Sequence, residues 1–377
     1  MRILALEPYY GGSHQAFLDG WITHSRHQWT VLSLPPYHWK WRMRHAAITM
    51  ARQLRHPPHQ GQEWDVLFCS DMLNLAEFRG LAPRPIANLK SCLYFHENQL
   101  TYPSQQPRDW DYHFNFTNFT SAIAADAIWF NTAFHRDEML VALAEFLDRM
   151  PDHQPLDEIE LIRNKSAIHY PGVPSIAPRL ARAPGPPRIT WASRWEHDKD
   201  PEMFFAAMEA LKGQGVSFRL NVLGQSFRNS PPIFASARDQ LAENIDRWGF
   251  LDSIEDYHET LRQTDIFVST AQHEFFGIAA VEAMTAGAYP LLPDRLAYPE
   301  LLQQTGHPER GCFLYDGDLT SLVERLAELT RQIPVTTDAD LPQRALDTRL
   351  QRFQWSERAP AMDQEIEYLA TGSSSYC

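Results

Sequence analysis

The chain has 377 residues, of which 44% are hydrophobic and 12% aromatic, and its formal net charge is −13 at pH 7. This length favours two domains over a single core, and the composition argues against long disordered segments. No apolar run is long enough to span a membrane, and the start, MRILALEPYYGG, is typical of a buried strand and not of a signal peptide. We therefore expect a globular, cytoplasmic protein without stable membrane association.

The acidic charge lies in the second half of the chain. Residues 1–185 contain 17 Lys plus Arg against 18 Asp plus Glu, a balance of −1, whereas residues 186–377 contain 17 against 29, a balance of −12. Residues 20–62 contain no acidic residue, although basic and aromatic side chains are interleaved there. These side chains, which predict a local basic and aromatic surface, are Arg26, Lys40, Arg42, Arg44, Arg52 and Arg55 with Trp29, Tyr37, Trp39 and Trp41.

The first half of the chain alternates short apolar segments with helical stretches. The apolar segments show no in-and-out alternation, which is typical of a parallel sheet covered by helices on both faces. They are RILALE (2–7), WTVLSL (29–34), DVLFCS (65–70), SCLYFH (91–96), AIWFN (127–131) and SAIHYP (166–171).

The same pattern restarts after a Pro-rich segment, SIAPRLARAPGPPR (175–188), whose composition is that of an interdomain linker. The second set of predicted strands is RITWAS (188–193), FRLNVLG (218–224), a short strand around RWGF (247–250), DIFVST (265–270) and YPLLP (289–293). The sequence therefore predicts an α/β fold of two doubly wound, Rossmann-like domains that face each other across a cleft.

The predicted boundaries place the first domain at residues 1–177, a linker at 178–188 and the second domain at 189–349. Residues 350–370 have apolar side chains at helical spacing and include Pro360, which predicts a kink. We expect this last segment, 350–377, to return to the first domain. The four cysteines lack metal-ligand or C-x-x-C spacing and are expected to be reduced: Cys69, Cys92, Cys312 and Cys377.

Two carboxylates stand out in the segment HEFFGIAAVEAM (273–284). Glu274 precedes a Phe-Phe-Gly step, and Glu282 lies inside an otherwise small and apolar helix that begins near Gly277. A carboxylate in such a helix needs a basic partner in the core or a place beside a ligand. Because polar ligands are commonly held at the carboxyl ends of parallel strands, beside helix N-termini, the second reading is favoured.

Two further clusters predict contacts with an anionic ligand. Gly11 and Gly12 follow the first strand and let backbone N–H groups approach a phosphate or sugar, although an ordinary tight turn would need the same residues. Arg194 and Lys199 follow the first strand of the second domain and could neutralise a diphosphate. The alternative is a solvated salt-bridge cluster with Glu196, Asp198 and Asp200.

These motifs together resemble the donor sites of retaining glycosyltransferases of the GT-B fold, family 4 type. Six of them, in this order, resemble more closely the family of tRNA-queuosine α-mannosyltransferases, and the resemblance spans roughly residues 1–302. They are YGGSH (10–14), LPPYHWKWR (34–42), LNLAE (73–77), YFHENQLTYP (94–103), RWEHDKDPEMFF (194–205) and HEFFG (273–277).

The resemblance implies a retaining glycosyltransferase that moves mannose from GDP-mannose to the cyclopentenediol of queuosine in tRNA. The first domain would bind the acceptor and the second the nucleotide sugar. In this fold retention is thought to need no protein nucleophile, because the leaving phosphate helps to deprotonate the incoming hydroxyl. Two other readings stay open: a family 4 enzyme with a lipid or polysaccharide acceptor, and a non-catalytic RNA-binding protein that has kept the fold.

The resemblance also implies roles for single residues. Arg194 and Lys199 would hold the leaving diphosphate, and His96 would contact the donor sugar, unless it is a satisfied core histidine. Glu274 would accept hydrogen bonds from sugar hydroxyls and Glu282 from both ribose hydroxyls. The remaining donor-binding positions are Gly11, Gly12, Phe275, Phe276 and Gly277.

The acceptor is expected on the first domain, at the basic and aromatic segment and at nearby strand ends. The candidate residues are His14, Lys40, Arg42, Arg44, Arg52, Arg55, Glu97, Asn98 and Asn131. The alternative packs Trp39 and Trp41 in the core, with Lys40 and Arg42 solvated on the opposite side of an extended segment. The run WKWRMRHAAITMARQLR could also be an amphipathic membrane-surface helix, as the lipid-acceptor reading requires.

The sequence predicts no catalytic metal and no cofactor besides the nucleotide-sugar substrate. Four D-x-D pairs occur, but a chain with 47 acidic residues produces such pairs by chance. Enzymes of the GT-B fold stabilise the leaving diphosphate with Arg, Lys and a helix N-terminus in place of a divalent ion. The D-x-D pairs are Asp109/Asp111, Asp198/Asp200, Asp316/Asp318 and Asp338/Asp340.

Overall fold

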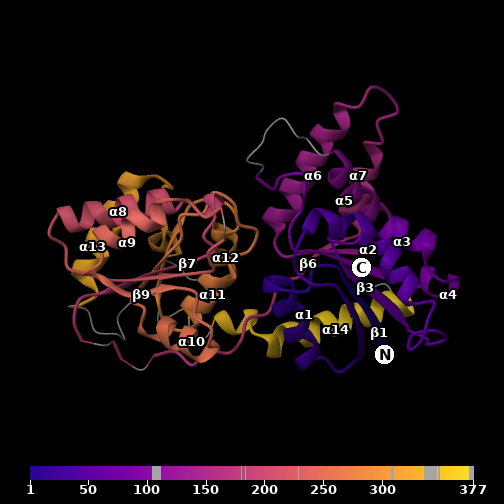
Figure 1. Ribbon diagram of the computed structural model, residues 1–377, viewed down its shortest axis with the longest axis horizontal. Coiled ribbons are helices and arrows are strands. Elements are labelled where there is room, and N and C mark those ends of the chain that lie inside the picture. Colours follow the sequence, from indigo (N-terminus) through magenta and orange to yellow (C-terminus); the bar gives the residue numbers. More distant parts are fainter. Residues whose placement is uncertain are drawn as a thin grey trace. The chain divides into compact units, whose positions relative to one another are not determined.

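The computed structural model describes residues 1–103, 112–179, 181–182, 184–227, 229–306, 310–334, 346 and 349–372. Its contacts divide the chain into two compact units (Figure 1). Unit 1 comprises Met1–Gly172 and Trp355–Cys377, and unit 2 comprises Val173–Gln354. Among the residues described in both units, no helix combines the length and the apolar composition needed to cross a membrane.

Unit 1 is built on a parallel sheet of six strands in the order β2-β1-β3-β4-β5-β6. Each strand coincides with one of the predicted apolar segments to within a few residues. The strands are β1 (Arg2–Glu7), β2 (Gln28–Ser33), β3 (Val66–Ser70), β4 (Ser91–Phe95), β5 (Ala127–Phe130) and β6 (Ser166–Ile168).

Helices cover both faces of this sheet, which explains why its strands lack alternation. Leu4 and Leu6 of β1 belong to one buried cluster, whereas Ile3 and Ala5 belong to another on the opposite face. The helices of unit 1 are α1 (Gly12–His24), α2 (Trp39–Gln53), α3 (Leu75–Leu81), α4 (Arg84–Ala87), α5 (Tyr112–Ala124), α6 (Ala133–Asp148), α7 (Asp157–Asn164) and α14 (Trp355–Thr371).

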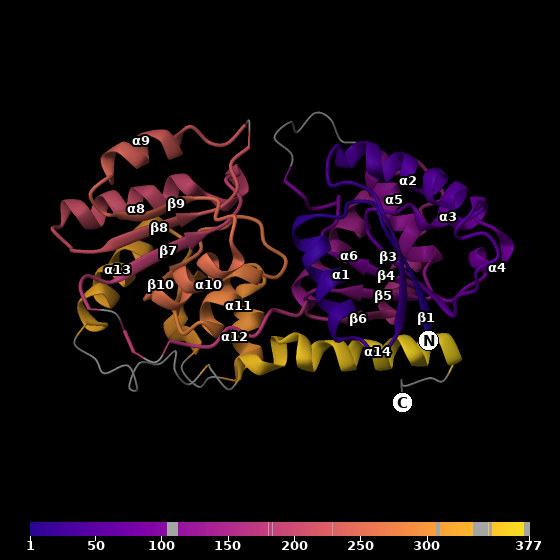
Figure 2. The ribbon, with the colours of Figure 1, turned by 60° about the horizontal axis from the view of Figure 1, so that its bottom comes forward.

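The last helix, α14, packs against α1 and against strands β3 and β4 of unit 1 (Figure 2). Trp355 belongs to the same buried cluster as Ile3 and Ala5 of β1, and a Cβ added at Gly20 would lie 2.2 Å from its ring nitrogen. Asp363, which is 1% exposed, accepts a hydrogen bond of 2.8 Å from Trp21 Nε1. Pro360 lies inside the helix. A segment distant in sequence therefore completes one face of the first sheet.

Unit 2 has a second parallel sheet, in the order β12-β11-β10-β7-β8-β9. The short strand β12 was not predicted, because two residues carry no periodic signal. The strands are β7 (Arg188–Ala192), β8 (Arg219–Leu223), β9 (Ile245–Gly249), β10 (Ile266–Val268), β11 (Tyr289–Pro293) and β12 (Leu314–Tyr315).

The helices of unit 2 are the 3₁₀ helices η1 (His197–Lys199), η2 (Arg310–Phe313) and η5 (Leu350–Phe353), and the α-helices α8 (Pro201–Gly213), α9 (Ile233–Gln240), α10 (Ile254–Gln263), α11 (Ile278–Thr285), α12 (Tyr298–Thr305) and α13 (Leu319–Gln332). Most of these helices connect the strands, and α13 and η5 follow the last strand. The predicted α/β fold with two doubly wound parallel sheets is confirmed.

The Pro-rich segment before β7 is tied to unit 2 by a buried carboxylate. Asp265 accepts a hydrogen bond of 2.7 Å from Arg179 Nη1 and another of 2.8 Å from the backbone N–H of Arg188. Asp265 is fully buried and Arg179 is 7% exposed. The described part of residues 178–188, which the sequence suggested as a linker, is thus joined to the second sheet by charge-assisted hydrogen bonds.

Candidate active site

Four polar residues follow four adjacent strands of unit 1. Glu7 ends β1, and Asp71, His96 and Asn131 come directly after β3, β4 and β5. Because the strands are parallel and neighbours in the sheet, their carboxyl ends bring these side chains to one edge. The sequence predicted His96 and Asn131 here. It did not single out Glu7 and Asp71, although both stand at a strand end as the other two do.

His14 and His96 form the centre of this group. The two rings lie with their centroids 4.0 Å apart, and Nδ1 of His14 is 3.3 Å from a Glu7 carboxylate oxygen. Burial lowers the pKa of His14, but Glu7 outweighs this effect and raises the pKa to about 9. Burial and the neighbouring His14 hold the pKa of His96 well below its usual range. At neutral pH, a charged His14 therefore lies against a neutral His96.

The backbone of His96 is held on both sides by buried side chains. Asp71 Oδ1 accepts a hydrogen bond of 2.9 Å from its N–H, and Asn131 Nδ2 donates one of 2.9 Å to its carbonyl. His135 Nδ1 in turn lies 2.8 Å from Asn131 Oδ1. The Nε2 atom of His96 is buried and has no hydrogen-bond partner among the described residues. The backbone of His96 is thus fixed, while one of its ring nitrogens makes no hydrogen bond within the described part of the chain.

This arrangement changes the roles expected for three acceptor candidates. Asn131 uses both ends of its amide inside the protein. Asn98 is fully buried, and its Oδ1 caps the turn that follows it by accepting from the N–H groups of Leu100 and Thr101, each at 3.0 Å. His14, 6% exposed, is committed to Glu7. These side chains shape the loops around His96 and do not form an open acceptor surface; Glu97 is partly exposed beside them.

Gly11 and Gly12 lie at the start of α1, as predicted. A Cβ on Gly11 would come within 2.4 Å of Pro36, so close packing alone requires a glycine there. Gly12 has φ of 55° and nothing within 4 Å of its missing Cβ, and the space beside this helix start is open. A ligand could therefore approach the backbone at Gly12, whereas Pro36 occupies the space beside Gly11.

Lys199 is the central cation of unit 2 and is 7% exposed. Its Nζ donates a hydrogen bond of 2.6 Å to the carbonyl of His273 and lies 3.4 Å from Glu274 Oε2 and 3.1 Å from Asp198 Oδ2. Burial lowers its pKa, but the two carboxylates outweigh burial and raise it. Lys199 therefore stays charged at every physiological pH.

Two loops of unit 2 are joined around this lysine. The backbone N–H of Gln272 donates to the carbonyl of Asp198 at 2.8 Å, and the hydroxyl of Thr270 donates to the carbonyl of Lys199 at 2.8 Å. These contacts bring together the loop after β7 and the loop after β10. Arg194 lies on the first loop and forms an ion pair of 3.3 Å with Glu196; its side chain is 49% exposed.

The Phe-Phe-Gly step positions the start of α11. Gly277 has φ of 98°, and a Cβ there would lie 2.9 Å from the Tyr298 ring, so only glycine fits. Phe275 and Phe276 are 4% and 3% exposed, which places their side chains in the core. Any contact of these two residues with a donor is therefore expected from the backbone.

Glu282 is partnered by a hydroxyl and not by a cation. The Tyr257 hydroxyl on α10 donates a hydrogen bond of 2.8 Å to Glu282 Oε2, and among the residues of the described ranges no Lys or Arg forms an ion pair with it. Burial raises the pKa of Glu282 to about 7, and the hydrogen bond from Tyr257 opposes this shift. The buried salt bridge considered from the sequence is thus not formed. The carboxyl group of Glu282 accepts one hydrogen bond from Tyr257 and can accept more.

The basic segment of unit 1 forms helix α2, so the extended segment considered from the sequence is not observed. Arg42 is 8% exposed, and its Nε donates a hydrogen bond of 3.0 Å to the carbonyl of Pro35. It is therefore an internal residue and not a surface phosphate contact. Trp41, by contrast, is 61% exposed. The other four basic candidates are exposed: Lys40, Arg44, Arg52 and Arg55.

Two D-x-D pairs in the described ranges have structural roles. Asp200 and Asp318 cap α8 and α13 by accepting from the N–H groups of Met203 and Ser321, at 3.1 and 2.8 Å. The pairs at Asp109/Asp111 and Asp338/Asp340 lie outside the described residues.

A different group, Glu7, His14 and His96, has ligand atoms that all lie within 4.8 Å of one another. The proton on His14 competes with a metal for this group.

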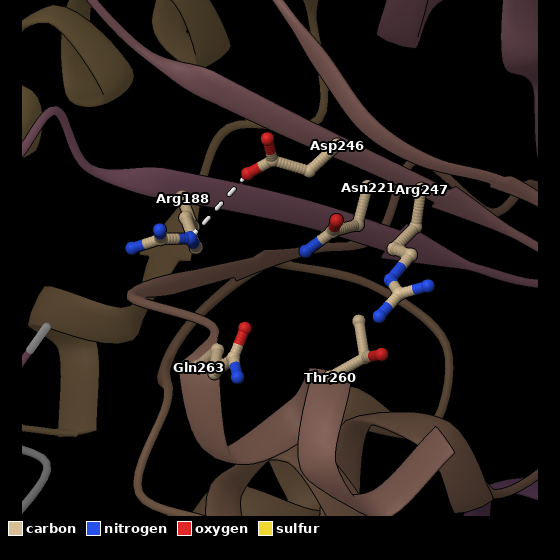
Figure 3. Close-up of a pocket in the computed structure, with 6 residues that line it drawn as sticks. All are labelled: Arg188, Asn221, Asp246, Arg247, Thr260 and Gln263. Atoms are coloured by element: carbon tan, nitrogen blue, oxygen red, sulfur yellow. Dashed lines mark ion pairs between the residues drawn. The ribbon is translucent and has the colours of Figure 1, made fainter. Parts of the chain in front are cut away.

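A polar pocket of about 280 Å³ lies beside the sheet of unit 2, where it is lined by the first residue of β7 and by residues of β8, β9 and α10 (Figure 3). Arg188, the first residue of β7, lines it together with Asn221 and Arg247 and forms an ion pair of 3.4 Å with Asp246. Arg194 and Lys199 follow the last residue of the same strand. The pocket is thus separate from the residues that the motifs supply, and we place no substrate in it.

Sequence analysis missed three residues that hold predicted site residues in place: Tyr257 donates to Glu282, Glu7 pairs with His14, and Asp71 accepts from the backbone N–H of His96. Asp198, which the sequence named only in the salt-bridge alternative, pairs with Lys199, as Glu274 does. Glu7 and Asp71 carried a signal, since each is acidic and stands at a strand end. Tyr257 carried none, because it lies 25 residues before its partner on a surface helix.

Comparison with known proteins agrees with this geometry. Residues 2–173 match the family model "tRNA-queuosine alpha-mannosyltransferase N-terminal", and residues 174–339 match "Glycosyl transferases group 1". A tRNA-queuosine alpha-mannosyltransferase from Drosophila melanogaster is 32% identical over 342 residues, covering 88% of each chain. A GDP-mannose:cellobiosyl-diphosphopolyprenol alpha-mannosyltransferase from Xanthomonas oryzae is 24% identical over 168 residues, or 44% of this chain and 43% of that relative.

A solved structure shows the same fold along the whole chain. The sucrose-phosphate synthase from Thermosynechococcus elongatus superposes with a TM-score of 0.74 at 15% identity and covers 99% of this chain and 100% of its own. At this identity the likeness concerns the GT-B fold alone. The match to the Drosophila relative over 88% of each chain, together with the two family models, shows that the chain belongs to the glycosyltransferase family of tRNA-queuosine alpha-mannosyltransferases.

Proposed function

We propose that the protein transfers mannose from GDP-mannose to a hydroxyl of the cyclopentenediol of queuosine in tRNA, with retention of the anomeric configuration. The name of the Drosophila relative supports the sugar and the acceptor, and the name of the Xanthomonas relative supports the GDP-linked donor. The observation that carries the proposal is the buried Lys199, held beside Glu274 at a strand end. A tRNA acceptor also implies a cytoplasmic location.

The chemistry needs stabilisation of charge on the leaving diphosphate. Lys199 is charged, desolvated and fixed by three contacts, so it costs little reorganisation when negative charge develops nearby. We assign the second counter-charge to Arg194, whose exposed guanidinium can form a bidentate contact with phosphate. Glu274 would accept hydrogen bonds from sugar hydroxyls, and Glu282 from the ribose. The leaving phosphate would take the proton of the incoming hydroxyl.

In unit 1 we propose that His96 Nε2 binds a hydroxyl group of the substrate. The neutral state of His96 and the absence of another partner among the described residues support this role. His14 and Asp71 would act as positioning residues, the first by ring contact and the second through the backbone N–H of His96.

The direct test is incubation with candidate nucleotide sugars and queuosine-containing tRNA, followed by mass analysis of the nucleosides. We expect one added hexose on queuosine with GDP-mannose and no product with UDP-glucose. Donor hydrolysis without tRNA provides a second readout. A protein that neither hydrolyses nor transfers any donor would be the non-catalytic RNA-binding protein considered above.

Metal independence gives a further prediction. Because Arg194 and Lys199 provide the counter-charge of the diphosphate, activity is expected to persist in excess EDTA. The measurement is the transfer rate after chelation and gel filtration, with and without added Mg²⁺ or Mn²⁺. An absolute requirement for added metal would contradict the proposal and would direct attention to Glu7, His14 and His96.

Two hydrogen bonds, from Asp71 and Asn131, hold the backbone of His96, and we call them the His96 clamp. We expect a substitution at Asn131 to change the reaction kinetics. Asn131→Ala removes the hydrogen bond to the carbonyl of His96 and leaves His135 Nδ1 without its partner. We expect turnover to fall by roughly tenfold while the affinity for GDP is unchanged, since misplacing a contact group by a fraction of an ångström is costly. Thr120→Ala, on an exposed part of α5, is the control. A normal turnover for Asn131→Ala would remove the clamp from the mechanism.

A further inference from the structure

The outward face of α2 carries a continuous row of side chains, which we call the α2 stripe: Trp41, Arg44, Ile48, Arg52 and Arg55. Their spacing of three, four, four and three residues places the first four on one side of the helix, and Arg55 lies two residues after its last residue, Gln53. Trp41 is 61% exposed and Ile48 55%, and the three arginines are also exposed. An exposed tryptophan in a row with three cations is unusual on an ordinary solvated helix face.

The opposite face of α2 is buried in unit 1, and this burial directs the side chains of the stripe toward solvent. Met50, Ala46, Ala47 and Ala51 belong to the buried cluster that also contains Leu4 and Leu6 of β1. Arg42, on this inner side, is held by the carbonyl of Pro35. The outward face of the helix then offers only two large apolar side chains, Trp41 and Ile48, among its arginines, which is less than the broad apolar face of a membrane-surface helix.

One side of the Trp41 indole packs against His45, whose own ring is fixed by hydrogen bonds. Its ring lies 4.9 Å from the ring of His45. Arg42 Nη1 is 2.9 Å from His45 Nε2, and Thr49 Oγ1 is 2.8 Å from His45 Nδ1. Because arginine only donates, His45 Nε2 accepts and its Nδ1–H donates to Thr49. A fixed aromatic ring loses little conformational entropy on binding.

The charge of the stripe selects an anionic partner. No acidic residue occurs between Asp19 and Glu63, although the chain as a whole has a net charge of −13. Arg44 and Arg52 are eight residues apart, about 12 Å along the helix axis, which is enough to reach more than one phosphate of a nucleic acid strand. A flat ring for a base and cations for the backbone are the two parts of a single-strand binding surface.

We propose that the α2 stripe binds an unpaired segment of RNA, with a base stacked on Trp41 and backbone phosphates at Arg44 and Arg52. Arg55, which donates to the carbonyl of Leu81, lies at the border of this surface. The inference rests on the proposed tRNA acceptor for its biological partner, and it adds the surface that holds this acceptor. Compared with the acceptor surface predicted from the sequence, this surface lacks Arg42, which is internal, and includes Trp41, which is exposed. From the sequence, Trp41 could equally have been a core residue. The proposal also accounts for the acid-free segment in an acidic chain.

The test measures RNA binding separately from sugar transfer. Full-length wild type, Trp41→Ala and Arg44→Glu/Arg52→Glu are titrated with queuosine-containing tRNA in gel-shift assays at two salt concentrations. We expect each variant to weaken tRNA binding by roughly tenfold or more, and the double variant to reduce the salt dependence by about 0.7 per lost phosphate contact in log–log slope. GDP affinity and the thermal midpoint should stay at wild-type values.

Matched controls exclude general effects of charge and of lost aromatic area. Arg149→Glu/Arg163→Glu makes the same charge change on α6 and α7, and Phe250→Ala removes an aromatic side chain that is 65% exposed in unit 2. Both controls should bind tRNA as the wild type does. A control as damaging as the stripe variants would show that net charge or surface area alone is responsible, which overturns the assignment.

The remaining outcomes separate this inference from the proposed function. If wild type binds tRNA and the stripe variants bind equally well, the stripe is not the surface, whatever the transfer assay shows. If the stripe variants lose tRNA binding but wild type transfers no mannose to it, the stripe stands and the proposed reaction fails. Sedimentation with anionic vesicles tests the lipid alternative: binding of wild type that Trp41→Ala abolishes would overturn the RNA assignment.

Discussion

Lys199→Ala is expected to lower turnover by a factor on the order of 10² or more, as for the loss of one charged contact to a transition state. Lys199 is the one group in the described part of unit 2 that is joined to Asp198, His273 and Glu274 at once. Removing its charge deprives the diphosphate of a fixed cation. It also leaves two carboxylates close to the site where negative charge develops, which adds repulsion to the loss of attraction.

The variant must be separated from a folding defect, because Lys199 is buried. The hydrogen bond to the carbonyl of His273 joins two loops, so Lys199→Ala is also expected to lower the thermal midpoint. Arg194→Ala supplies the second test: its side chain is 49% exposed, and it should lose turnover by a similar factor without losing stability. Lys212→Ala, an exposed position in the last turn of α8, is the matched control. Near-wild-type turnover in both Lys199→Ala and Arg194→Ala would contradict the donor site.

Nucleotide binding is expected to depend on pH through Glu282. Burial raises the pKa of this carboxyl group to about 7, from an ordinary value of 4.5. Ribose hydroxyls donate hydrogen bonds, so they bind the carboxylate better than the acid. GDP affinity should therefore rise between pH 6 and pH 8, by up to about tenfold for one group with this pKa. Calorimetry in buffers of different ionisation enthalpy would also detect the released proton.

Glu282→Gln should weaken GDP binding and abolish this pH dependence. The same substitution predicts an effect on stability. The carboxyl group has a pKa of about 7 in the folded protein and about 4.5 in the unfolded chain, so the folded state binds the proton more tightly. This tighter binding contributes to the free energy of unfolding at low pH, and the contribution is lost as the pH rises from about 4.5 to about 7. Above pH 7 the Gln variant should therefore have gained stability relative to wild type. Glu324→Gln, exposed on α13, should change neither property, and an unchanged pH profile in Glu282→Gln would remove Glu282 from the nucleoside site.

Sequence reasoning located the strands and many of the candidate residues. Parallel sheets covered on both faces leave a run of apolar residues without alternation, and all but one of the strands could be read from such runs. The glycine at 277 was also predictable, since an αL residue at a helix start leaves few alternatives. The candidate residues followed because motif residues that stand after parallel strands converge at the carboxyl edge of a sheet.

The partners of those residues could not be predicted in the same way. Glu282 was expected to pair with a cation or with a ligand, but its partner within the chain is the Tyr257 hydroxyl on another helix. Asn131 was expected at an open surface, but both ends of its amide are used by His96 and His135. Hydrogen-bond partners depend on which loops meet across a sheet edge, and spacing along the chain does not specify this.

The sequence by itself thus determined the two sheets, the strands that His96, Lys199 and Glu274 follow in the chain, and the resemblance that names the family. The tertiary structure decided which side chains of one segment are inside and which are outside. In α2 it placed Arg42 against the carbonyl of Pro35 and exposed Trp41. Two adjacent residues of a helix point about 100° apart, so their exposure follows from what the helix packs against, and only the folded chain supplies that surface.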